Sequence, residues 1–148
     1  MELKDGVSND KAISFAIENN SLLMVKILIE HGTKINECLA GLTPLGLACY
    51  RDRYEIAKYL LEQGADPNKR FQLWNSNPLL IAAYNGSPKV VELLLKNGAD
   101  AKYKAKRSAM SRTALGMLEA RKKINPNNNS PKVIEEIEKL LLDAGAEE

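Results

Sequence analysis

Short stretches of the chain place apolar residues three and four positions apart, which is the spacing of one helix face. Two stretches show this most clearly, with apolar residues at Ile56, Ala57, Leu60 and Leu61 and again at Val90, Val91, Leu94 and Leu95. Gly64 and Gly98 follow these stretches at equal distances. Because glycine adopts the left-handed conformation that closes a helix at little steric cost, the pattern predicts two short helices that end there.

Each predicted helix is preceded by another that begins at a capping residue. Thr43 can accept a hydrogen bond from the first turn of a helix, and Pro44 suits the first helical position, where its missing N–H has no helical partner. The segment TPLGLA at 43–48 and the segment NPLLIA at 77–82 lie 34 residues apart, and the GAD triplets at 64–66 and 98–100 keep that spacing. A repeated pair of antiparallel helices is therefore predicted.

Two fainter copies of the unit flank the clear ones. The first runs from about Ala12 to Gly32, and the last begins at Thr113 and closes at Gly145. We expect one domain over residues 1–148, with repeats at about 9–36, 41–68, 75–102 and 111–146. The last repeat contains an insertion at about 122–131, and its Asn-rich segment from Asn125 to Pro131 is expected to be a polar loop between the last two helices.

These motifs resemble those of the ankyrin-repeat family over about residues 9–146. The resemblance implies an all-α solenoid of four helix-turn-helix units with projecting turns, in which the terminal units act as caps. The residue after the Pro-Leu pair departs from the family pattern, because Gly46, Leu80 and Gly116 stand where a histidine is usual. The hydrogen bonds of that histidine must therefore be absent or replaced. Glu138 stands where the preceding repeat has Val91, as expected for a solvated end.

The composition agrees with a helical repeat protein and argues against a β-sandwich and a membrane protein. Hydrophobic residues make up 45% and charged residues 27%, near the globular average, while aromatics are only 5%, which favours closely stacked helices over a β-sandwich. The sequence contains no apolar run of about 20 residues and no export signal at its start, so we expect no membrane span and a cytoplasmic location. Cys38 and Cys49 are expected to be reduced thiols.

The residues that carry chemistry are sparse. His31 is the only histidine and stands at a predicted helix end, where a cation favours the helix dipole. One histidine with Cys38 and Cys49 provides neither a nucleophile constellation nor tetrahedral metal spacing. The Gly-Lys pairing of a phosphate-binding loop is also missing. We therefore expect no enzyme activity, metal or cofactor. The alternative of a small enzyme would require a deep pocket with perturbed titratable groups.

The resemblance implies that partners meet the turn tips and the exposed face of the first helices, which line a concave groove. On that template the candidate partner-binding residues are Tyr50, Arg51 and Tyr84 on first helices and Arg70, Phe71 and Trp74 in the turn at 69–76. Trp, Tyr and Arg are the residue types that dominate interface energetics. The alternative is that Phe71 and Leu73 fold back onto the neighbouring turn while Trp74 covers helix ends.

The fourth turn carries the strongest charge signal. Its candidate partner-binding residues are Lys102, Lys104, Lys106, Arg107 and Arg112. Between residues 101 and 123 the only acid is Glu119, so the remainder of this chain of net charge +2 is negative. An acidic protein surface is the expected partner. A solvated loop without a partner is one alternative, and nucleic acid bound by residues 102–123 is another, which we do not favour.

The sequence thus predicts a non-catalytic protein-interaction module that acts as an adaptor or inhibitor by occupying a partner's surface. An immunity protein, an antitoxin-like protein or an enzyme regulator would fit this description. We expect the free chain to be a monomer.

Overall fold

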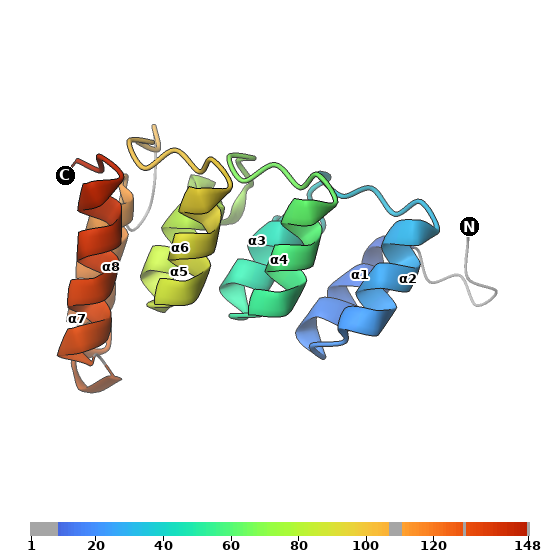
Figure 1. Ribbon diagram of the computed structural model, residues 1–148, viewed down its shortest axis with the longest axis horizontal. Coiled ribbons are helices and arrows are strands. Elements are labelled where there is room, and N and C mark those ends of the chain that lie inside the picture. The colour runs from blue at the N-terminus through green and yellow to red at the C-terminus, as the bar shows by residue number, and fades with distance from the viewer. Residues whose placement is uncertain (1–8, 107–110, 129, 148) are drawn as a thin grey trace.

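Four antiparallel helix pairs stand side by side in the computed structural model, which describes residues 9–106, 111–128 and 130–147 (Figure 1). The first two pairs are α1 (Asn9–Glu18) with α2 (Leu22–Glu30) and α3 (Pro44–Tyr50) with α4 (Tyr54–Glu62). The last two are α5 (Pro78–Asn85) with α6 (Pro88–Lys96) and α7 (Ala114–Ile124) with α8 (Pro131–Asp143). Within the described ranges the chain has no β-strand beyond two isolated bridges. The predicted all-α solenoid of four units is confirmed.

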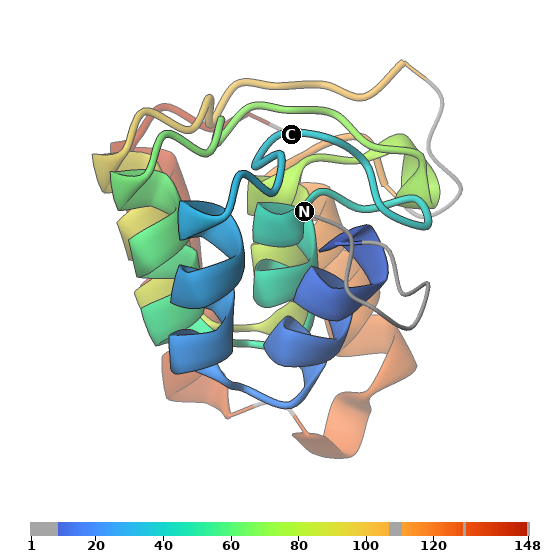
Figure 2. The ribbon, with the colours of Figure 1, turned by 90° about the vertical axis from the view of Figure 1, so that its right-hand side faces the viewer.

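The helices form two layers, with α1, α3, α5 and α7 in the inner layer and α2, α4, α6 and α8 in the outer layer. Each helix contacts its own partner and the helix of the same layer in the next pair. The turns rise at one end of the helices and extend across the inner layer and beyond it (Figure 2). We call the side formed by the inner helices and these overhanging turns the inner face.

The inner helices begin as the sequence predicts. The Thr43 hydroxyl accepts a hydrogen bond from the Gly46 amide at 3.0 Å, and Pro44 occupies the first turn. Asn77 and Thr113 cap α5 and α7 in the same way, through the amides three residues further on, at 3.0 and 3.1 Å. Each cap satisfies an amide that lacks a helical partner.

The core lies between the layers and between successive pairs. Its largest fully buried side chains come from all four pairs and are Ile13, Ile17, Leu45, Ile56, Leu60, Leu79, Leu80, Ile81, Leu94, Met117, Leu118 and Ile137. Because every repeat contributes to this core, no pair buries its apolar face alone.

Two asparagines that the sequence analysis missed connect successive turns. The Asn36 side chain donates to the Gly64 carbonyl at 3.3 Å and accepts from the Asp66 amide at 2.7 Å. Asn68 repeats this contact one unit later, with distances of 2.9 Å to the Gly98 carbonyl and 2.8 Å from the Asp100 amide. Both asparagines follow the helix-ending glycine by four residues, a regularity visible in the sequence.

The expected loop from Asn125 to Pro131 lies between the last two helices. Helix α7 continues to Ile124, a 3-10 turn covers Pro126–Asn128, and α8 begins at Pro131. The extension has a physical reason, because the Lys122 ammonium lies between the carboxylates of Glu119 on the same helix and Glu138 on α8. The first residues of the insertion therefore lengthen α7, and the following ones connect it to α8.

Candidate protein-interaction surface

Three aromatic side chains meet under the third turn. Trp74 contacts the ring of Tyr50 on α3 with 6.2 Å between centroids, and the ring of Tyr84 on α5 with 5.0 Å. Both contacts are edge to face, at 69° and 71° between planes, the geometry that aromatic pairs favour. All three residues are half-buried. The structure thus brings together the predicted aromatic residues of two repeats and the turn between them, which we call the aromatic cluster.

The backbone at Trp74 is unusual. Trp74 has φ 52° and ψ 19°, and the following Asn75 has φ 49°. Two consecutive non-glycine residues in the left-handed region cost free energy, and such strain persists only where the surroundings enforce it. The bridge in which Phe71 and Ser76 exchange backbone hydrogen bonds, at 3.0 and 3.3 Å, closes this turn and holds the indole over α3 and α5.

Arg51 extends the aromatic cluster toward the N-terminal end. Its guanidinium lies 5.3 Å from the centroid of the Tyr50 ring, and Nη2 is 3.0 Å from Oε1 of Glu18 on α1. The two charged side chains are 46% and 47% exposed, so solvent screens their attraction. Arg51 therefore presents a donor next to the aromatic rings while it remains accessible.

The prediction that Phe71 contacts a partner is corrected by the structure. Phe71 is only 4% exposed, and its ring lies against the inner helix at Gly46. A β-carbon built on Gly46 would lie 2.6 Å from Cε1 of Phe71, so the ring occupies space that any larger residue would need. The alternative interpretation, in which Phe71 folds back, describes the structure. Glycine at the usual histidine position is the sequence signal for this contact.

The basic residues of the fourth turn separate into two groups. Lys106 and Arg112 are exposed, and Arg112 Nε donates to the Ala105 carbonyl at 2.9 Å, which ties the two sides of the turn together. Lys104 lies 3.6 Å from a carboxylate oxygen of Glu147, and the Lys102 side chain runs along Gly145, so both face the end of α8. Arg107 lies outside the described residues.

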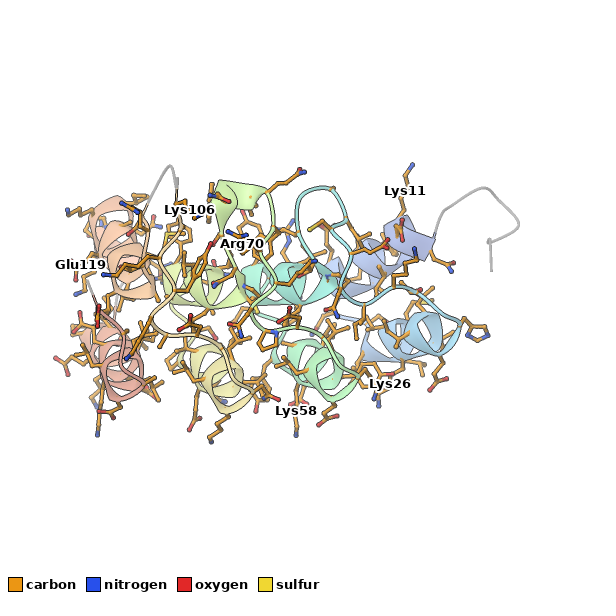
Figure 3. All side chains as sticks on the ribbon, turned by 90° about the horizontal axis from the view of Figure 1, so that it is seen from above. Lys11, Lys26, Lys58, Arg70, Lys106 and Glu119 are labelled. Carbon is orange, nitrogen blue, oxygen red and sulfur yellow. The ribbon has the colours of Figure 1, made fainter. Side chains whose placement is uncertain are left out.

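Arg70 stands apart from these contacts. It is exposed in the third turn. In the view from above, Arg70 and Lys106 lie toward the inner layer, while Lys26 and Lys58 point from the outer helices (Figure 3). The predicted surface residues Tyr50, Arg51, Arg70, Trp74, Tyr84, Lys106 and Arg112 therefore belong to the inner helices and their turns.

Two pockets open away from the aromatic cluster. The larger, about 960 Å³, lies at the C-terminal end and is lined by Lys104, Ser111, Arg112, Thr113, Leu115, Gly116, Glu119, Glu138, Leu142 and Ala146. The Lys122 ammonium lies between two of its carboxylates, Glu119 and Glu138, and its hydrogen bonds to them, that to Glu119 first, raise the pKa of Lys122. The ion pairs of Lys122 with Glu119 and Glu138 connect α7 to α8. The smaller pocket, about 380 Å³, lies beside Arg121 and Gly86.

Comparison with known proteins gives the same assignment as the geometry. A family model described as ankyrin repeats in three copies matches residues 1–71, and a second, described as ankyrin repeats in many copies, matches residues 48–95. The chain belongs to the ankyrin-repeat family. Members of this family are generally non-catalytic protein-interaction modules, and the repeats of this chain indicate a protein-interaction module.

The individual relatives are much longer proteins, and this chain matches only a small part of each. The chain is 31% identical over 90 residues to the ankyrin repeat and KH domain-containing protein mask-1 of Caenorhabditis elegans. It is 33% identical over 89 residues to the ankyrin repeat protein nuc-2 of Neurospora crassa. These matches cover 61% and 60% of this chain but 3% and 8% of the relatives. A glycerophosphocholine phosphodiesterase of Eremothecium gossypii is 40% identical over 57 residues, which are 38% of this chain and 4% of the relative.

The ankyrin repeats are also joined on the inner face by side chains that the sequence analysis did not single out for this role. Asn85 donates to the Cys49 and Tyr50 carbonyls at 2.8 and 2.6 Å, at the end of α3. One repeat later, Arg121 donates to the Tyr84 carbonyl at 3.2 Å, at the end of α5. Each contact satisfies carbonyls that a helix leaves open and fixes the residues beside the aromatic cluster.

Three further features concern metal binding, membrane crossing and thiol chemistry. Among the described residues, no group of three His, Cys, Asp or Glu side chains is placed to hold a metal ion. None of the helices in those residues has the length and apolarity of a membrane-crossing segment. Cys38 is exposed and Cys49 is buried, at the position that Ala83 fills in the next repeat, and burial raises the pKa of the Cys49 thiol.

Proposed function

We propose that this ankyrin-repeat chain is a non-catalytic adaptor or inhibitor that binds a partner protein on its inner face. The observation that carries the proposal is the position of Trp74, held by a strained turn between Tyr50 and Tyr84 and next to the accessible guanidinium of Arg51. Burying these side chains under a partner would occlude the partner's surface without any turnover. A reducing compartment such as the cytoplasm suits the exposed thiol of Cys38.

The aromatic cluster has the properties of a binding anchor. Tryptophan, tyrosine and arginine are the residues whose truncation most often costs binding free energy, and they do so near the centre of an interface. A rigid turn reduces the conformational entropy that is lost when a partner immobilises the indole. The contacts with Tyr50 and Tyr84 fix the Trp74 ring before any partner arrives.

We propose that the partner presents an acidic surface. Arg70, Lys106 and Arg112 are exposed in the two turns on the inner side, and Lys102 and Lys104 extend the basic region toward the C-terminal end. Exposed charges of one sign speed the encounter with a surface of the opposite sign, and salt weakens this effect. The aromatic cluster would then set the dissociation rate, and the basic turn the association rate.

Affinity capture with matched variants tests this proposal. The chain and its Trp74→Ala variant are immobilised, and proteins retained from the native host are identified and then purified for surface-plasmon kinetics. For the authentic partner, Trp74→Ala should lower affinity about thirtyfold or more, mainly through faster dissociation. Because Trp74 is the only tryptophan, its fluorescence reports directly whether a tryptophan-free partner segment covers the cluster.

The charge component has its own control. The triple variant Lys104, Lys106, Arg112→Ala should slow association at low salt and approach the wild type at high salt. A second triple variant, Lys58, Lys89, Lys132→Ala, removes the same charge from exposed residues of the outer helices and should leave affinity unchanged. If the outer triple variant lowers affinity while Trp74→Ala does not, the partner binds the outer helices and the proposal is wrong.

A further inference from the structure

The smaller pocket, about 380 Å³, lies where the connection between α7 and α8 passes beside the turn from α5 to α6. In Figure 1 this connection is at the end of the helices opposite the projecting turns. The pocket volume falls within the range of about 300–1,000 Å³ that small-molecule sites occupy. Its lining therefore shows which class of ligand it could hold.

Arg121 brings a positive charge into this pocket without a carboxylate to balance it. Its two terminal nitrogens donate to the carbonyls of Tyr84 and Asn128, each at 3.2 Å. Both acceptors are neutral, and none of the carboxylates in the described part of the chain forms an ion pair with Arg121. Because the side chain is also half-buried, its charge is only partly solvated and favours an anionic ligand.

The Arg121 guanidinium occupies the space that a side chain at Gly86 would need. A β-carbon built on Gly86 would lie 2.6 Å from Nε and 2.8 Å from Cζ of Arg121. Gly86 has φ 71° and closes α5 in the left-handed conformation that favours glycine. Arg121 is thus fixed over the α5–α6 turn before any ligand binds, which lowers the conformational entropy lost on binding.

The other lining residues suit an anion that is attached to an apolar group. Asn127, Asn128 and Ser130 are exposed and can donate hydrogen bonds from amide and hydroxyl groups. Val133 and Ile134 in the first turn of α8 provide an apolar wall. The positive end of the α8 dipole adds to the field of the guanidinium, because the Ser130 side chain makes no capping bond. No acid is present among the described lining residues.

We propose that this pocket binds the carboxylate of a ligand whose apolar group packs against Val133 and Ile134. A single unbalanced cation matches a single negative charge, which favours a monocarboxylate over a phosphate dianion. The two oxygens of a carboxylate also match the planar guanidinium, and the apolar wall would gain nothing from an inorganic anion. A free branched acid and the C-terminal leucine of a protein share this chemistry. The site is separate from the aromatic cluster, and its ligand is distinct from the partner proposed for the inner face.

NMR titration of the isotope-labelled full chain with N-acetyl-leucine tests this proposal, with N-acetyl-leucine amide as the neutral control. The signals of the Arg121 Nε–H group and the Gly86 amide should shift and saturate with the acid. A ligand of this size should bind with a dissociation constant of about 1 mM. The amide should bind about tenfold more weakly or less, because it brings no charge to the guanidinium.

Two variants and a matched control separate the pocket from general charge effects. Arg121→Met removes the guanidinium and should abolish saturable binding. Lys123→Met removes the same charge from an exposed residue of α7 outside the pocket and should leave the affinity within about twofold of wild type. Asn127→Asp changes an exposed residue, so that the fold is retained, and should weaken binding of the acid about tenfold or more by charge repulsion.

Three results overturn the proposal: no saturation with the acid, equal affinity for its amide, or equal losses in Arg121→Met and Lys123→Met. Inorganic phosphate that shifts the same signals at lower concentrations overturns the choice of a carboxylate. A tripeptide with a free C-terminal leucine then separates the two sources of the ligand. Tighter binding than N-acetyl-leucine assigns the pocket to a protein C-terminus, and equal or weaker binding assigns it to a free acid, and both results support a carboxylate site.

Discussion

The ring of Phe71 lies against the backbone of Gly46, so that a turn of one repeat fills the space left by a missing side chain in the preceding one. The position is helical and carries histidine elsewhere in the family. Because a β-carbon there would lie 2.6 Å from the Phe71 ring, glycine and phenylalanine act as a complementary pair.

Gly46→Ala should therefore destabilise the chain although alanine is the better helix former. The substitution gains about 1 kcal/mol in helix propensity but costs about 1–3 kcal/mol in overpacking, and Phe71 is too buried to move freely. Urea unfolding should show a net loss of about 1 kcal/mol. In a Phe71→Leu background the same substitution should be stabilising. Equal effects in both backgrounds would show that the ring and the glycine do not compete for space.

This contact also shows where sequence reasoning is sufficient and where it fails. Periodic apolar positions, Thr43 as a cap and Gly64 as a helix end specify the repeats, because these signals act within one helix or turn. Phe71 was misjudged because its burial depends on a residue 25 positions earlier in a neighbouring repeat. Aromatic content in a turn does not reveal whether the ring faces the core or the solvent.

The aromatic cluster was predictable in its members but not in its geometry. Trp74, Tyr50 and Tyr84 follow from the template of the repeats, yet the left-handed backbone at Trp74 that orients the indole has no signal in the sequence. The pairing of Lys104 with Glu147 was also missed, because the two residues are distant in sequence and meet only when α8 returns to the fourth turn. Long-range side-chain contacts of this kind require the fold.

The asparagines between the turns give a prediction on stability. Asn68→Ala removes two hydrogen bonds to the backbone of the next turn, at exposed positions where each contributes about 0.5–1 kcal/mol, so we expect a loss of about 1–2 kcal/mol. Asn36→Ala should have a similar effect one repeat earlier. Asn97→Ala, which removes only a bond within one helix end, is the control and should cost less. Calorimetric melting of the three variants makes the comparison.

Lys102 stands at the third position of this series, where asparagine does not recur. Lys102→Asn should allow the same pair of hydrogen bonds to the chain after Gly145 and so raise stability by up to about 1 kcal/mol. Thermal unfolding at matched ionic strength measures the change. A lower melting temperature would mean that the lysine stem packed along Gly145 contributes more than the hydrogen bonds would.

The two cysteines should differ in reactivity. Cys49 is 0% exposed on α3, and burial, followed by the charge of Asp52, raises the pKa of its thiol, so the reactive thiolate is suppressed. Cys38 is exposed in a turn. A chromogenic disulfide reagent should therefore modify one thiol per folded chain within minutes and the second only in urea. A Cys38→Ser variant should react only when unfolded, and rapid labelling of that variant in buffer would contradict the stacking of α3 on α5.

Lys122 joins α7 to α8 and should give stability a dependence on alkaline pH. Its pKa is raised in the folded chain by hydrogen bonds to Glu119 and then Glu138. A lysine whose pKa is higher in the folded state stabilises that state fully below its unfolded pKa of about 10.4, and this contribution is lost as pH rises through the folded value. Lys122→Met keeps most of the stem and should cost about 0.5–2 kcal/mol at neutral pH, as expected for a partly exposed ion-pair network.

Urea unfolding of both proteins at a series of pH values isolates the ammonium. The difference between wild type and Lys122→Met should stay constant from about pH 7 to about pH 9.5 and shrink above about pH 10.5, because the wild-type lysine then loses its charge as well. Glu138→Gln provides the matched control, since it weakens the interhelical contact while Glu119 still binds Lys122 within α7. If the difference in unfolding free energy between wild type and Lys122→Met persists unchanged above pH 11, the effect of Lys122 comes from packing of its stem. The ammonium would then contribute no stability through its contacts with Glu119 and Glu138.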